Sequence, residues 1–243
     1  MPFVFCTKCD TIFSVIEKAV RTYCDARERM DTMIGFYDYT VILTFLSVVS
    51  SVVGMGFAVT GHFLAAIICL LVSGLCDLFD GMVARTKKNR TEEEKKNGIQ
   101  LDSLADIVCF GAFPALIGLE LAKEERYFFL MVIAVALYVL CGIIRLAYFN
   151  VTEDLRQQQT KDKRKNYEGL PITSVALIIP ALFCSKPFLA EVFPIAYMIL
   201  LILVAVCFIL KWKIKKLGIT GNIVLVCIGI LILAILVATG FLH

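Results

Sequence analysis

Long apolar stretches alternate with short polar segments along most of this 243-residue chain. A helix needs about 20 apolar residues to cross a bilayer, and seven stretches come close to that length. They fall at residues 40–60, 62–84, 99–121, 127–149, 170–189, 191–211 and 218–242. Pro180 and Pro187 interrupt the fifth stretch, so we expect six to seven transmembrane helices. The pattern predicts an all-α, polytopic membrane helix bundle.

The N-terminal segment has a different pattern, because charged residues interrupt each of its apolar runs. We therefore expect it to be neither a signal peptide nor a span. Within residues 12–23, apolar residues recur on one helical stripe opposite charged ones, which predicts an interfacial amphipathic helix. A flexible tail is the alternative. We therefore divide the chain into an N-terminal interfacial segment, residues 1–36, and a transmembrane domain, residues 37–243.

Positive charge lies mainly on one side of this predicted layout. The N-terminal arm and the connections after the second, fourth and sixth spans are rich in lysine and arginine, whereas the other connections hold only Lys123, Arg126 and Lys186. Lysine and arginine favour the cytoplasmic side of a membrane. We therefore expect a cytoplasmic N-terminus, an outer C-terminus, and His62 and His243 on the outer side.

Four aspartates lie near the ends of the second and third spans. Asp77 and Asp80 are three positions apart, and Asp102 and Asp106 are four apart, so each pair occupies one face of a helix. Carboxylates that converge in a partly dry site repel one another unless a cation lies between them. Carboxylate oxygens favour hard cations such as Mg²⁺ or Mn²⁺. The alternative is that these acids only extend toward lipid headgroups.

The four acids belong to a longer motif that adds small residues and an arginine. It reads Asp77-x-x-Asp80-Gly81-x-x-Ala84-Arg85, then Gly98-x-x-x-Asp102-x-x-x-Asp106. This motif resembles the signature of the CDP-alcohol phosphatidyltransferase family, integral membrane enzymes in which an alcohol displaces CMP from a CDP-linked substrate. Twelve residues separate Arg85 from Gly98, more than is usual in the family. We interpret this polar run, Thr86–Asn97, as a loop insertion.

Three further segments resemble the phosphatidylserine synthase branch of that family. They are the segment 101–106 with the following Phe-Gly and Pro-Ala pairs, Arg-Leu-Ala-Tyr-Phe-Asn at 145–150, and Gly-Leu-Pro-Ile at 169–172. Tyr148 replaces a basic residue of the branch pattern, and Thr173 replaces a proline. The resemblance implies that CDP-diacylglycerol and L-serine are the substrates. The alternatives are another acceptor, such as inositol phosphate or glycerol phosphate, and an ion- or proton-coupled transporter.

The resemblance also implies roles for individual residues. Asp77, Asp80, Asp102 and Asp106 would hold Mg²⁺ or Mn²⁺, two ions in all, and Asp106 would also accept the serine proton. The residues alone do not rank Asp106 above Asp102 as the base. Contacts to CDP-diacylglycerol are expected from Asp38, Tyr39, Thr40, Val41, Asp77, Gly81, Ala84, Arg85 and Gly98.

Contacts to serine or to phosphate are expected from Ser103, Arg145 and Asn150. The alternatives are an ion pair between Arg145 and one of the acids, and a helix-capping role for Asn150. We further expect a multi-pass protein of the cell membrane with its active site facing the cytoplasm. A homodimer is expected, and a nucleic-acid partner is not.

Overall fold

The computed structural model describes residues 39–240 apart from 85, 88–90, 160–165 and 216–218. The N-terminal interfacial helix, Asp38 and Arg85 therefore lie outside the described residues. The described elements, in chain order, are η1 (Tyr39–Val41), α2 (Ile42–Val59), α3 (Phe63–Ala84), α4 (Glu92–Asp106), the π-helical segment η2 (Ile107–Ala112), α5 (Phe113–Ala122), α6 (Phe128–Gln159), β1 (Asn166–Glu168), η3 (Ile172–Ser174), α7 (Val175–Phe183), α8 (Lys186–Leu189), η4 (Ala190–Val192), α9 (Phe193–Ile209), β2 (Lys213–Lys215) and α10 (Ile219–Gly240).

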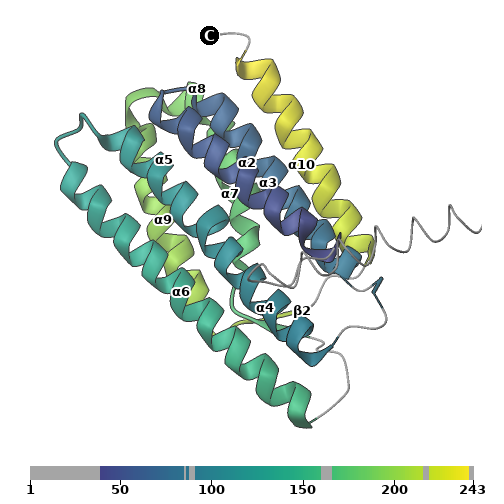
Figure 1. Ribbon diagram of the computed structural model, residues 1–243. Coiled ribbons are helices and arrows are strands. Elements are labelled where there is room, and N and C mark those ends of the chain that lie inside the picture. Colours follow the sequence, from purple (N-terminus) through teal and green to yellow (C-terminus); the bar gives the residue numbers. More distant parts are fainter. Residues whose placement is uncertain (1–38, 85, 88–90, 160–165, 216–218, 241–243) are drawn as a thin grey trace, which may run out of the picture. The chain divides into compact units, whose positions relative to one another are not determined.

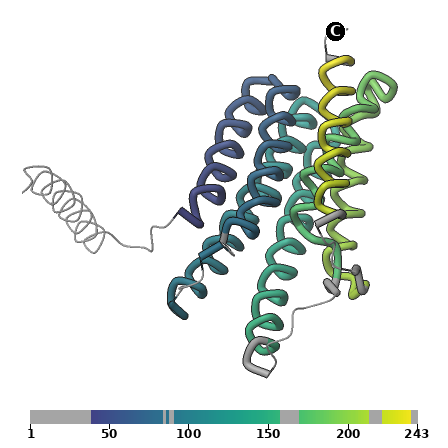
Figure 2. Tube along the Cα trace, turned by 90° about the vertical axis from the view of Figure 1, so that its right-hand side faces the viewer, coloured from purple at the N-terminus to yellow at the C-terminus, as the bar shows by residue number. Residues whose placement is uncertain are grey.

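The helices of residues 40–240 pack side by side as a bundle (Figures 1 and 2). Helix α2 packs along α3, α6 packs along α9, and α5 contacts α2, α6 and α9. Strands β1 and β2 pair antiparallel and join the connection after α6 to the connection after α9. Only two short strands occur in the described part of the chain, so the all-α prediction is confirmed.

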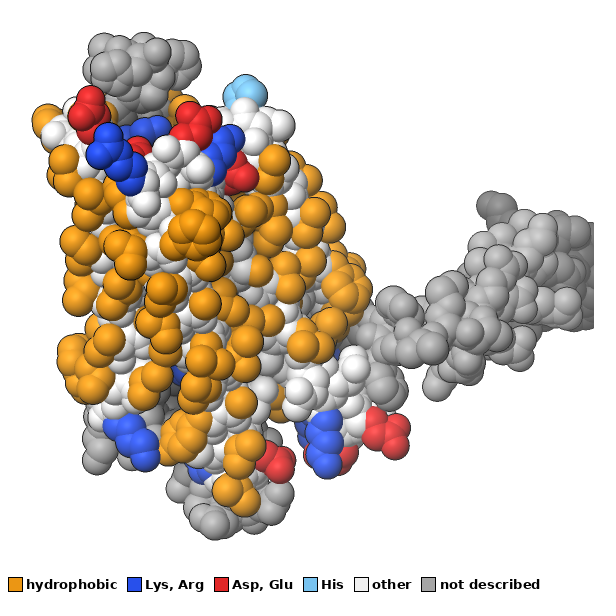
Figure 3. All heavy atoms as spheres, turned by 90° about the vertical axis from the view of Figure 1, so that its left-hand side faces the viewer, with side chains coloured by type: hydrophobic (Ala, Val, Ile, Leu, Met, Phe, Trp, Pro, Cys, Tyr) orange, Lys and Arg blue, Asp and Glu red, His pale blue; other side chains and the backbone are white. Residues whose placement is uncertain are grey.

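Within the described residues, six helices are long and apolar enough to cross a membrane. They cover Tyr39–Val59, Phe63–Val83, Glu92–Ala122, Phe128–Arg156, Lys186–Ile209 and Gly221–Ala238. On the face seen in Figure 3, hydrophobic side chains cover the middle of the bundle and charged side chains gather at its two ends. This is the distribution expected when lipid surrounds the middle of the bundle. The prediction of a polytopic membrane protein is confirmed.

The fifth predicted span, residues 170–189, is not one continuous helix. Its apolar helix covers only Ile172–Phe183, and a separate short helix, α8, follows at Lys186–Leu189. Gly169 has a φ of +76° and its N–H donates to the Trp212 carbonyl at 2.9 Å, so the chain is still turning just before the helix. At the other end Pro187 occupies the first turn of α8, a position that suits the start of a helix and not its interior.

Two predicted loops turn out to be partly helical. The polar run Thr86–Asn97 was interpreted as a loop, but α4 already begins at Glu92. Thr91 caps this helix, because its Oγ1 accepts from the Glu94 N–H at 3.1 Å and Glu94 Oε2 accepts from the Thr91 N–H at 3.1 Å. Such a reciprocal pair is a capping box. Helix α6 likewise continues to Gln159, so Asn150 lies inside a helix and the capping role considered for it is wrong.

A π-helical segment directly follows Asp106. In an α-helix the carbonyl of Phe110 would accept from residue 114, but Pro114 has no N–H to donate. The buried hydroxyl of Tyr138 donates to this Phe110 carbonyl, and Tyr197 Oη donates to the Pro114 carbonyl at 2.8 Å. Tertiary hydrogen bonds from α6 and α9 thus support the irregular backbone that joins α4 to α5 within one span.

Gly54 provides a test of how closely the helices pack. A Cβ added there would lie 2.4 Å from Cζ of Phe113 and 2.7 Å from Cβ of Cys69. Gly54→Ala should therefore force α2 away from α3 and α5, and such overpacking typically costs about 1–3 kcal/mol. We expect a lower midpoint of thermal unfolding in detergent.

Gly56 is the matched control, because it lies on the same helix and an added Cβ there meets nothing within 4 Å. Gly56→Ala should leave the midpoint unchanged or raise it slightly, since alanine favours a helix over glycine. Equal midpoints for the two variants would contradict the close packing around Gly54.

Candidate metal centre

Four aspartates meet where the end of α3 approaches the end of α4. Single carboxylate oxygens of Asp77, Asp102 and Asp106 all lie within 4.8 Å of one another. Asp80 interacts electrostatically with Asp102. The two acidic faces expected from the spacing therefore do converge. Asp80 and Asp106 are both buried, at 8% and 9% exposed.

Asp80 is held by a residue that the sequence analysis did not assign. Thr44, on α2, donates from Oγ1 to Oδ2 of Asp80 at 3.0 Å, and both side chains are buried. A signal for this contact exists in the sequence. Thr40, Thr44, Ser47 and Ser51 recur at i, i+4, i+7 and i+11 along an otherwise apolar helix, so they form a polar stripe on one face.

The residues expected to contact CDP-diacylglycerol fall into separate groups. Gly81 follows Asp80, and among the described residues an added Cβ there would meet no atom within 4 Å, so this part of the structure leaves space beside the acids. Gly98 lies on α4, one turn before Asp102. Thr40 and Val41 are buried at the start of α2, four and three residues before Thr44. Tyr39 is half-exposed, and Ala84 ends α3.

The residues expected to contact serine are partly brought together. Asn150 Nδ2 donates to Ser103 Oγ at 2.8 Å, which links α6 to α4 at the residue next to Asp102. Ser103 Oγ in turn donates to the Ile99 carbonyl at 3.0 Å. Arg145 is buried on α6. A polar contact between α4 and α6 therefore lies next to the acids.

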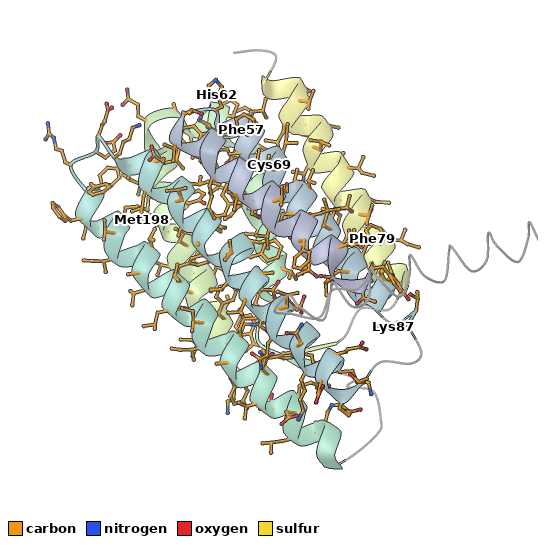
Figure 4. All side chains as sticks on the ribbon, viewed as in Figure 1. Phe57, His62, Cys69, Phe79, Lys87 and Met198 are labelled. Carbon is orange, nitrogen blue, oxygen red and sulfur yellow. The ribbon has the colours of Figure 1, made fainter. Side chains whose placement is uncertain are left out.

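The acids lie near one end of the bundle. Figure 4 places Phe79, which separates Asp77 from Asp80 along α3, at the same end as Lys87, whereas His62 lies at the opposite end. Lys87 forms an ion pair with Glu94 at 3.3 Å, next to the start of α4.

The donor set fits a divalent cation. Three carboxylate oxygens within 4.8 Å of one another are hard ligands, which suit Mg²⁺ or Mn²⁺ better than they suit zinc or copper. Without a positive charge among them, these carboxylates would repel one another in a largely dry site. The cluster can therefore hold a metal ion.

Comparisons with known proteins find a matching family model and several relatives. The family model described as CDP-alcohol phosphatidyltransferase matches residues 39–241. CDP-diacylglycerol–serine O-phosphatidyltransferase of Saccharomyces cerevisiae is 37% identical over 155 residues, which cover 61% of this chain and 54% of that protein. Archaetidylserine synthase of Methanothermobacter thermautotrophicus is 33% identical over 142 residues, covering 58% of this chain and 56% of that protein.

A bacterial relative gives a similar result. CDP-diacylglycerol–serine O-phosphatidyltransferase of Helicobacter pylori strain 26695 is 31% identical over 143 residues, covering 59% of this chain and 56% of that protein. The chain thus matches somewhat more than half the length of each of these three relatives.

Proposed function

This chain belongs to the CDP-alcohol phosphatidyltransferase family, and we propose that it transfers the phosphatidyl group of CDP-diacylglycerol to the hydroxyl of L-serine, releasing CMP. The observation that carries this proposal is the convergence of Asp77, Asp102 and Asp106 inside the region that the family model matches. The acceptor is supported by the relatives, since the names of all three specify a serine product or a serine acceptor. One of the three names specifies a different lipid part, so serine is the element that all three share.

Asp77, Asp80 and Asp102 would hold the metal, and Asp106 would share in holding it. We keep two ions of Mg²⁺ or Mn²⁺ as part of the proposal. When bound, they would supply positive charge that stabilises the negative charge developing on the leaving phosphate. Thr44 supports this arrangement, because its hydrogen bond to Oδ2 of Asp80 restricts how that carboxylate can turn.

Asp106 would accept the proton of the serine hydroxyl. The serine oxygen then forms a bond to the phosphorus that carries diacylglycerol, and the bond from that phosphorus to the bridging oxygen of CMP breaks. The open space at Gly81 suits a substrate group close to the acids. Ser103 and Asn150 lie on the α6 side of Asp102 and, with Arg145, would orient the serine or a phosphate oxygen.

The proposal also covers the side of the membrane that the active site faces and the oligomeric state of the protein. The acids lie at the end of the bundle that carries Lys87, and residues of this kind favour the cytoplasmic side, so the active site would face the cytoplasm from the cell membrane. The protein would also form a homodimer. Ser47, Ser51 and Gly54 are buried within the chain, so the dimer interface would use other residues.

An acceptor panel tests the reaction. Purified protein with CDP-diacylglycerol and Mn²⁺ should release CMP when L-serine is added, and EDTA should stop the release, because the acids can no longer hold the metal. Inositol phosphate and glycerol phosphate are tested in parallel. Faster CMP release with either of them than with serine would contradict the acceptor, and no release with any acceptor would contradict the reaction.

A further inference from the structure

Between the acids and the middle of the bundle, three hydroxyl groups and one thiol form a buried hydrogen-bonded cluster. Ser47 Oγ lies 2.7 Å from Ser73 Oγ, and Ser51 Oγ donates to Ser73 Oγ at 2.9 Å. Ser47 Oγ also lies 3.5 Å from Sγ of Cys109. All four side chains are at most 3% exposed. We call this set, Ser47, Ser51, Ser73 and Cys109, the serine cluster.

The hydrogen bonds of the serine cluster can be assigned without conflict. Ser51 donates to Ser73, which leaves the Ser73 hydroxyl to donate to Ser47. Ser47 then donates its own proton to the Ser73 carbonyl at 3.1 Å or to Cys109. Each hydroxyl thus has a donor role, as buried hydroxyls in an apolar surrounding require.

Three of the four members lie about one helical turn from a group of the candidate metal centre or from Thr44, which holds Asp80. Ser47 follows Thr44 by three residues on α2, Ser73 precedes Asp77 by four on α3, and Cys109 follows Asp106 by three in the π-helical segment. On α2 and α3, residues three or four apart share a helix face. The serine cluster therefore joins, at one point, the three elements whose next turns carry Thr44, Asp77 and Asp106.

We propose that the serine cluster, with Ser47 and Ser73 at its centre, is a positioning device that sets the spacing of the carboxylates before metal binds. This proposal rests on the metal-binding role proposed above. The π-helical segment gives such a device a role, because irregular backbone begins directly after Asp106. The hydrogen bond from Ser47 on α2 to Cys109 at 3.5 Å would hold this segment to the α2–α3 pair that Ser47 and Ser73 join, while Thr44 holds Asp80.

The test measures Mn²⁺ affinity without substrate. Full-length protein is purified free of metal in lipid nanodiscs, and free Mn²⁺ is followed by electron paramagnetic resonance. Ser47→Ala and Ser73→Ala should each raise the Kd for Mn²⁺ by roughly 3- to 15-fold, the range that interhelical hydrogen bonds in membranes imply. If one of the two variants does not fold, the Mn²⁺ Kd of the other still tests the positioning role.

Ser50→Ala is the matched control. Ser50 also lies on α2 and also bonds to α3, through Oγ to the Cys69 carbonyl at 2.9 Å, but that bond is farther from the acids along both helices. Ser50→Ala should lower the thermal unfolding midpoint about as much as Ser47→Ala and leave the Mn²⁺ Kd unchanged. Equal Kd values for the two variants would overturn the positioning role.

Double variants give a second, independent criterion. Ser47→Ala combined with Ser73→Ala removes both partners of one hydrogen bond, so its effect on the Mn²⁺ Kd should be well below the product of the single effects. If the effects of the two single variants on the Mn²⁺ Kd simply multiply in the double variant, the proposal is overturned. Absence of Mn²⁺ binding by the unaltered protein would instead overturn the metal centre itself, so the two failures are distinguishable.

Discussion

Replacing Asp106 with asparagine should lower the rate of CMP release by about 10²–10⁴-fold, the usual effect of removing a general base. The amide keeps the size of the carboxylate and one coordinating oxygen, so the buried site should stay packed and retain part of its metal affinity. An amide cannot accept the serine proton at neutral pH. Added Mn²⁺ should therefore fail to restore the rate, which is measured with saturating CDP-diacylglycerol and serine.

Two controls accompany the Asp106 variant. Glu120→Gln makes the same kind of change at the opposite end of the bundle, where Glu120 pairs with Lys123 at 3.2 Å, and it should leave the rate unchanged. Mn²⁺ affinity and the thermal midpoint are measured on the same preparations, since a misfolded protein loses both. If Mn²⁺ restores the Asp106→Asn variant, the proton goes to another group and Asp106 acts as a ligand only.

The helical architecture could be predicted because lipid imposes a simple requirement. A chain that crosses a bilayer must satisfy its backbone internally and expose apolar side chains, so the apolar stretches located the membrane-crossing helices, although α4 begins before its apolar stretch and α6 extends past its own. The start of α4 could also have been predicted. Thr91-Glu92-Glu93-Glu94 is a capping-box pattern and glutamate and lysine favour helices, but the charged run was interpreted as a loop.

Other features depend on tertiary contacts that no local pattern contains. The π-helical segment is supported by Tyr138 and Tyr197, which come from helices far along the chain. The extent of α7 depends on the turn at Gly169 before it and on Pro187 after it, and neither excluded a longer helix by itself. Local sequence signals of this kind only favour one conformation of a segment, and the packing of neighbouring helices decides which conformation forms.

For the site, spacing alone placed each acid pair on one helix face. It could not show that the two faces meet, because this depends on how α3 and α4 pack, and the resemblance to a family supplied that expectation. The contact between Thr44 and Asp80 was missed because small polar residues in the first span were interpreted only as packing residues. A threonine that recurs with serines on one face of an apolar helix also indicates a hydrogen-bonded contact.

Removing one charge from the metal centre should act differently from removing the base. Asp77→Asn, Asp80→Asn and Asp102→Asn should each weaken Mn²⁺ binding, by at least the roughly 10–100-fold that loss of an outer-sphere partner costs. The rate of CMP release should fall at low Mn²⁺ and recover in part as Mn²⁺ is raised, because the remaining carboxylates and the amide oxygen still offer ligands. Titration of the rate against free Mn²⁺ measures this, with Glu120→Gln as the unchanged control.

Asp80 makes this comparison more informative than a test of the cluster as a whole. It lies outside the group of three oxygens within 4.8 Å, and one of its own oxygens accepts from Thr44, so its other oxygen is the freer of the two to bind a metal. Asp80→Asn should still show recovery with Mn²⁺ if that oxygen is a ligand. A lost rate that Mn²⁺ does not restore, at normal Mn²⁺ affinity, would mean that Asp80 positions substrate or Asp102 instead, and the four-carboxylate metal centre would reduce to Asp77, Asp102 and Asp106.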